Sequence, residues 1–107
     1  MTAARQRLPN RRASETFAFT CGDFTYIATI SRFSDGTLAE IFLGNGKAGS
    51  GSDTAAKDSA VVASIALQHG VPLDVIRHAL LRDPRGVASS PLGVALDALA
   101  AADEVAA

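Results

Sequence analysis

Residues 15–43 read ETFAFTCGDFTYIATISRFSDGTLAEIFL, and apolar and polar side chains alternate along three short runs of this stretch. A period of two, rich in β-branched and aromatic residues, is typical of strands that bury one face. Gly22 and Gly36 lie in the two gaps between the runs, where tight hairpins favour glycine. The stretch therefore predicts a three-stranded antiparallel meander with strands over Glu15–Thr20, Phe24–Arg32 and Leu38–Leu43.

Helical patterns fill the rest of the chain. The first helix is expected from about Thr54 to His69, with Ser52 or Asp53 as its N-cap and Gly70 just after its end. The second is expected from Pro72 to about Leu81, and the third opens at Ser90-Pro91. Strands followed by helices predict an α+β fold with the helices packed on one face of the sheet. The expected divisions are a flexible basic arm over 1–14, one domain over 15–103 and a frayed tail over 104–107.

The predicted core joins the sheet to the first helix. That helix is apolar around nearly its whole circumference from Val61 to Leu67, which indicates burial on most sides. We therefore expect Ile65→Asp to unfold the domain by burying an unpaired charge. The strand residues expected to meet this helix are Phe17, Phe19, Ile27, Ile41 and Leu43.

Composition excludes several classes of protein. The chain has 107 residues, 48% hydrophobic and 20% charged, which suits a single globular domain. Its formal net charge of −1 argues against binding of nucleic acid or an acidic membrane through the overall charge of the domain. Cys21 is the only cysteine, so no internal disulfide can form and a cytoplasmic location is expected. We expect no contact with a membrane, because no apolar run reaches the roughly 18 residues that a span needs.

A glycine-rich loop links the third strand to the first helix and is a candidate anion- or nucleotide-binding site. Glycines let backbone N–H groups converge on an anion, and a helix N-terminus follows. Ala48 stands where a P-loop needs serine or threonine, and Asp53 would repel an anion, so a plain strand-to-helix crossover is the competing interpretation. The candidate site residues are Gly46, Lys47, Gly49, Ser50 and Ser52.

The N-terminal arm is a second candidate, for contact with a partner protein or nucleic acid. Basic terminal arms often bind nucleic acid, although many are only solvated linkers. The arginines concerned are Arg5, Arg7, Arg11 and Arg12.

No catalytic or metal-binding constellation is visible in the sequence. Cys21 has no local base to activate it, and His69 and His78 are the only imidazoles, without the further ligands that a metal site requires. Asp53 and Lys57 have the i,i+4 spacing of an ordinary helix ion pair. We therefore expect no enzyme activity, no cofactor and no metal.

Several segments together resemble a known domain. They are Leu8-Pro9-Asn10-Arg11-Arg12, Gly36–Phe42, the Gly44–Gly49 loop with Lys47, and Ser64–Leu73. These segments resemble the linker, strand, loop and helix of the TSCPD domain, the C-terminal accessory domain of adenosylcobalamin-dependent (class II) ribonucleotide reductases. The motif that gives the domain its name is absent here, and Thr20-Cys21-Gly22-Asp23 is at most an echo of it. The resemblance implies the fold and a free-standing accessory domain, without the reductase's catalytic cysteines or cobalamin site.

The expected function is a non-catalytic binding or interaction module. Its expected partner is a protein, such as a ribonucleotide reductase or another enzyme of nucleotide metabolism. The alternative is a nucleotide- or nucleic-acid-binding protein that uses the Gly44–Ser52 loop and the N-terminal arginines. We also expect a homo-oligomer, because a three-stranded sheet has exposed edges.

Overall fold

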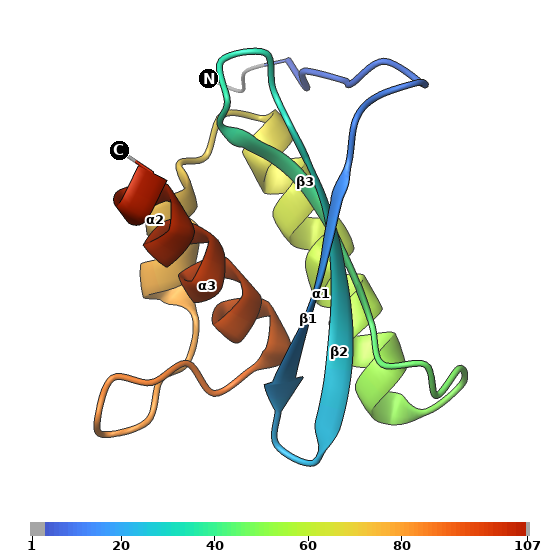
Figure 1. Cartoon of the computed structure of the whole chain (residues 1–107), viewed down its shortest axis with the longest axis vertical. Helices are drawn as coiled ribbons and strands as arrows, with labels where there is room; N and C mark the ends of the chain where they lie inside the picture. The colour runs from blue at the N-terminus through green and yellow to red at the C-terminus, as the bar shows by residue number, and fades with distance from the viewer. Residues whose placement is uncertain (1–3, 107) are drawn as a thin grey trace.

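The computed structural model describes residues 4–106, in which three strands precede three helices (Figure 1). The sheet has the order β1-β2-β3, and both neighbouring pairs are antiparallel. The predicted α+β meander is confirmed, and its strand bounds agree to within one residue. The elements are β1 (Glu15–Cys21), β2 (Phe24–Arg32), β3 (Leu38–Gly44), α1 (Gly51–Gln68), α2 (Leu73–Ala79) and α3 (Pro91–Ala106).

Two glycine turns fix the register of the meander. Gly22, with φ of 60°, lies in the turn between β1 and β2, which places Cys21 opposite Phe24. In the second turn, the Asp35 carboxylate accepts hydrogen bonds from the backbone N–H and the hydroxyl of Thr37, at 2.9 and 2.6 Å. Both contacts are local, which is why the turns could be predicted from the sequence.

The two faces of the sheet have different environments. Ala28 and Ile30 point into the core and are fully buried, and Ile41 lies opposite Ile30 on β3. Ile27 was expected in the core, but that prediction is wrong, because 46% of the residue is exposed. Side chains alternate along a strand, so Ile27 must lie on the face opposite to Ala28. The helices cover only the Ala28 face, as predicted.

Helix α1 lies along the outer edge of β3 and satisfies its backbone (Figure 1). The Ser64 hydroxyl donates to the carbonyl of Ile41 and accepts from its N–H, both at 2.9 Å. The Gln68 side-chain amide donates to the carbonyl of Ala39 at 3.2 Å. Ser64 and Gln68 are each about 5% exposed, so these bonds lie out of water. An edge strand that would otherwise present open hydrogen-bonding groups is therefore covered.

Small side chains allow α1 to approach the strand closely. Ala56, Ala60 and Ala63 are all buried on the side of the helix that carries Ser64. The opposite side is open: Val61, Val62 and Ile65 are 47%, 67% and 39% exposed. The prediction that this helix is buried on most sides is wrong. The reason given for unfolding by Ile65→Asp also fails, because the new charge would reach water.

The helix ends agree with the sequence in part. The N-cap of α1 is Ser50, which accepts from the N–H of Asp53, whereas Ser52 or Asp53 was expected. At the other end Gly70, with φ of 90°, follows the helix as predicted. Helix α3 extends to Ala106, beyond the expected limit at 103, and residue 107 lies outside the described residues.

We predict that Ser64→Ala lowers the free energy of unfolding by about 1–3 kcal/mol, because it leaves the buried N–H and carbonyl of Ile41 without partners. Urea denaturation followed by circular dichroism measures the change. Ser59→Ala is the matched control, since the Ser59 hydroxyl only donates to the carbonyl of Ala56 within the same helix. Equal denaturation midpoints for the two variants would contradict the role assigned to Ser64.

Candidate functional site

The glycine-rich loop uses its own polar groups to hold its shape. The side-chain NH₂ of Asn45 donates to the Ser52 hydroxyl at 2.9 Å, and the side-chain carbonyl of Asn45 accepts from the backbone N–H of Lys47 at 3.0 Å. Gly46 and Gly49 have φ of 76° and 82°, a conformation that other residues rarely adopt. The loop is therefore a turn held by internal hydrogen bonds.

A buried carboxylate lies at the start of α1, directly beside this loop. Asp53 is 2% exposed, accepts from the N–H of Asn45 at 2.9 Å and pairs with Lys57 at 2.7 Å. The ammonium of Lys57, then the Asn45 N–H, lower the pKa of Asp53, so this carboxylate keeps its charge. The Lys47 ammonium lies 5.5 Å from the centroid of the Phe24 ring, a cation–π geometry. The Asp53–Lys57 pair is confirmed. The anion site stays a prediction, and these contacts weigh against it.

The N-terminal arm is anchored on α1 and β3 at two points. The Arg5 guanidinium donates to the side-chain carbonyl of Gln68 at 2.7 Å, and the backbone N–H of Gln6 donates to the backbone carbonyl of Gln68. The Arg12 guanidinium binds both oxygens of Glu40, at 2.6 and 3.0 Å. Residues 4–14 form no helix or strand. Among the described residues, the exposed Arg7 and Arg11 have no side-chain partner, and contact with nucleic acid stays a prediction for them.

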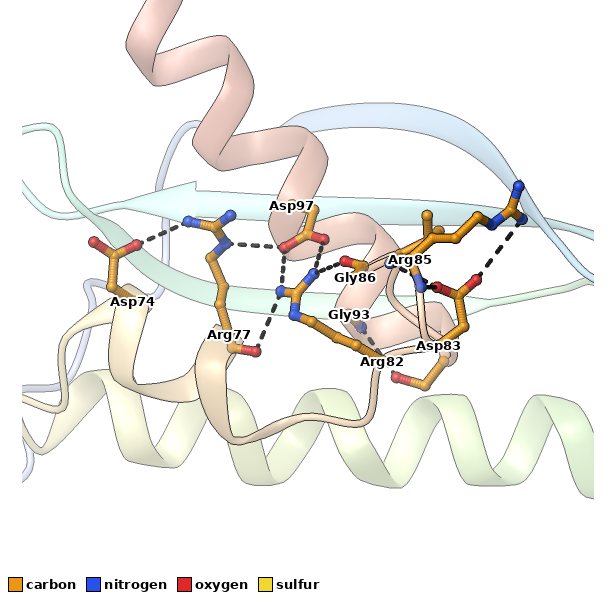
Figure 2. A network of polar contacts seen from close by, with 10 residues as sticks. Asp74, Arg77, Arg82, Asp83, Arg85, Gly86, Gly93 and Asp97 are labelled. Atoms are coloured by element: carbon orange, nitrogen blue, oxygen red, sulfur yellow. Dashed lines mark hydrogen bonds and ion pairs between the residues drawn. The ribbon is translucent and has the colours of Figure 1, made fainter.

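A carboxylate on α3 joins α2 to the connector that follows it (Figure 2). Both oxygens of Asp97 accept from Arg82, at 2.7 and 2.8 Å, and one also accepts from Arg77 at 3.0 Å. Arg82 and then Arg77 lower the pKa of Asp97 to about 2. Arg77 also pairs with Asp74, so the charges of this cluster largely cancel. The cluster holds the connector and α2 against α3 and leaves little net charge for a ligand.

A mostly apolar concave surface lies between α1, α2 and α3, and we call it the α1–α2 groove. Its volume is about 380 Å³. Val62 of α1 is the most exposed of its apolar lining residues, at 67%, and it shares the groove with Ile76 of α2 and with Leu80, which follows that helix. Asp58 adds a carboxylate that has no ion pair among the described residues. The full lining is Asp58, Ser59, Val62, Ala63, Ala66, Ile76, Leu80 and Leu92.

A larger cavity of about 450 Å³ lies where the arm meets the second hairpin and the start of α2. Its lining mixes backbone turns with two carboxylates, Asp35 and Asp103. Asp35 is already bonded to Thr37, and Asp103 lies 3.5 Å from the Arg32 guanidinium. These groups serve the fold, and they do not converge on a ligand.

The sequence interpretation missed this groove for a clear reason. Val61 and Val62 were assigned to the core because the helix is apolar on nearly every side. Periodicity cannot show which of several apolar faces meets the sheet. A signal was present nevertheless: the small residues Ala56 and Ala60 and the polar Ser64 share one face, and the larger β-branched residues lie on another.

A scan against protein-family models identifies the domain. The model of the TSCPD domain matches residues 2–102, nearly the whole chain. The chain belongs to the TSCPD domain family. The resemblance that the sequence motifs implied is thereby confirmed.

Curated relatives of this TSCPD domain are much longer proteins. The chain is 36% identical over 70 residues to the vitamin B12-dependent ribonucleotide reductase of Agrobacterium fabrum, and 33% identical over 70 residues to that of Bradyrhizobium diazoefficiens. Each match covers 65% of this chain but only 6% of the reductase. No solved structure matches the chain.

The residues that carry the family resemblance do structural work. Arg12 of the first motif binds Glu40 of the second, and Ser64 and Gln68 of the last motif bind β3. The matching motifs therefore mark the contacts that join the arm, β3 and α1. They indicate a shared fold.

The part of the chain that the structure describes has neither a metal-binding cluster nor a membrane-spanning helix. Between residues 4 and 106, no three His, Cys, Asp or Glu side chains gather where they could hold a metal ion. None of the helices in the same range is long and apolar enough to cross a membrane.

Asp97 should make the stability of the TSCPD domain depend on pH in acid. Its folded pKa of about 2 lies below the ordinary value of 3.8, so its stabilisation is complete above pH 4 and is lost as the pH falls toward 2. We expect Asp97→Asn to lower the free energy of unfolding at pH 7 by about 1–3 kcal/mol and to flatten its slope between pH 4 and pH 2. Urea titrations across this range measure both effects.

The control for this prediction is Asp58→Asn, which removes an exposed carboxylate without an ion pair among the described residues. It should keep the acid slope of the parent. An Asp97→Asn variant with both the parent's acid slope and the parent's free energy of unfolding at pH 7 would show that the Arg77–Asp97–Arg82 cluster contributes nothing to stability.

Proposed function

We propose that this TSCPD domain is a non-catalytic protein-binding module that binds its partner at the α1–α2 groove. The observation that carries the proposal is the apolar lining of the groove together with the exposure of Val62. Contiguous exposed apolar surface is uncommon on soluble proteins and often marks a site of protein association. Burying such side chains in a complex would remove apolar area from water and stabilise the complex.

The groove also favours a particular kind of partner segment. It lies among α1, α2 and α3, and an apolar groove between helices can accept the apolar face of a further, amphipathic helix. Asp58 at the groove would favour a basic residue beside that apolar face. We propose an amphipathic helix with leucine-type side chains and a neighbouring lysine or arginine as the complementary segment.

The proposed partner is a vitamin B12-dependent ribonucleotide reductase or another enzyme of nucleotide metabolism. The support for this choice is the similarity of the chain to a short region of two such reductases. In this proposal the domain binds the surfaces that the similar region contacts within the longer reductase. Its effect would then be on assembly or on domain position, because the described residues include no group of nucleophile, base and orienting residue.

We predict that Val62→Asp weakens binding to the purified reductase by about ten-fold or more, because it places a charge in the apolar groove. Surface-immobilised reductase titrated with the domain gives the dissociation constant. Val87→Asp is the matched control, since Val87 is 54% exposed and lies outside the groove lining. Equal weakening by the two variants would rule out the groove as the site.

The same proteins can test the alternative function. If nucleotides or RNA raise the melting temperature of the parent while the reductase does not bind, the domain is a nucleotide- or nucleic-acid-binding protein instead. Because Arg7 and Arg11 are the exposed arginines without side-chain partners among the described residues, their joint change to alanine should then reduce the shift.

A further inference from the structure

The two edges of the sheet differ. The outer edge of β3 is covered by Ser64 and Gln68 of α1. The other edge belongs to β1, whose Cys21 pairs with Phe24 across a two-residue turn. Residues that flank such a turn exchange hydrogen bonds with each other, and the pattern alternates along the strand. The backbone N–H and carbonyl groups of Thr16, Ala18 and Thr20 therefore point away from β2.

Strand β1 lacks the basic residues, the proline and the bulge that usually protect an edge. Natural edge strands carry lysine or proline, contain a bulge, or lie under a helix or loop. The segment Glu15–Cys21 contains no basic residue and no proline, and it pairs with β2 without a bulge. No described side chain donates to or accepts from the outward backbone groups of Thr16, Ala18 or Thr20. The arm does not cover them either, since it turns toward Glu40 and Gln68.

The sequence of this edge is symmetric. Thr16-Phe17-Ala18-Phe19-Thr20 reads the same in both directions. If a second copy of β1 pairs antiparallel about a two-fold axis at Ala18, threonine lies opposite threonine and phenylalanine opposite phenylalanine. Both kinds of pair stabilise neighbouring strands, and the smallest side chain of the five falls at the axis. The outward backbone groups of each copy then face those of the other.

We propose that two copies of this chain join through β1 into one six-stranded sheet with a two-fold axis at Ala18. Phe17 and Phe19, which are only half-buried in one copy, gain aromatic neighbours from the other copy. Helix α3 packs beside β1, and its exposed residues include Ala98, Ala101 and Ala102, which carry only methyl groups. An isologous contact of this kind closes at the dimer. It uses a surface separate from the α1–α2 groove, so it does not depend on the proposed function.

The self-pairing of Ala18 gives a sharp test. The Ala18 side chain is exposed on the open face, so Ala18→Lys and Ala18→Glu should each keep the monomer fold. In a dimer, each variant places like charges opposite one another at the axis, and we expect its dimer dissociation constant to rise by about ten-fold or more. A mixture of the two variants places lysine opposite glutamate, and dimers should reappear. Size-exclusion chromatography with light scattering measures the mass in each case.

Ala48→Lys and Ala48→Glu are the matched controls, because Ala48 is an exposed loop residue outside the sheet. They should remain as dimeric as the parent, and circular dichroism checks that every variant is folded. A monomeric parent at high micromolar concentration would overturn the proposal. Ala18 variants as dimeric as the parent, or a mixture no more dimeric than its components, would also overturn it.

Discussion

The hydrogen bonds from Ser64 and Gln68 to β3 are the constraint on which the rest of the fold depends. They satisfy the backbone of Ile41 and Ala39 where water cannot reach. Because an unpaired buried backbone group costs about 1–3 kcal/mol, α1 must lie in a defined register along the strand. Gln68 also accepts the two hydrogen bonds from the arm, so the position of the N-terminal segment depends on the same register.

The register of α1 along β3 also determines which of its side chains are exposed to solvent. A helix that turns its small and polar residues toward a strand edge must turn its other residues elsewhere. In this chain those residues are Val61, Val62 and Ile65, and of the three only Val62 lines the α1–α2 groove. The covering of the β3 edge and the exposure of the apolar groove both follow from the orientation of α1. Helix α1 protects the sheet at β3 and exposes a surface suited to another protein.

The ion-pair and hydrogen-bond partners of several arginines also depend on the tertiary structure, and the sequence did not predict them. Arg5 and Arg12 were interpreted as parts of a free arm, yet Gln68 and Glu40 hold them, 63 and 28 residues away in the sequence. Arg82 lies between the second and third predicted helices, and Asp97 binds it from α3. Partners at such separations leave no periodic signal. The local Asp53–Lys57 pair, four residues apart, could be predicted because helix geometry alone brings it together.

The sequence by itself determined the order, type and approximate limits of all six elements, and the family. These features follow from periodicity, turn residues and motifs that act over a few residues. Only the tertiary structure decided that α1 covers the edge of β3, that Ile27 and Val62 reach solvent, and that β1 remains open. The physical reason is that a helix with apolar residues on several sides could bury any one of those sides against the sheet. Contacts with distant backbone groups select one of them.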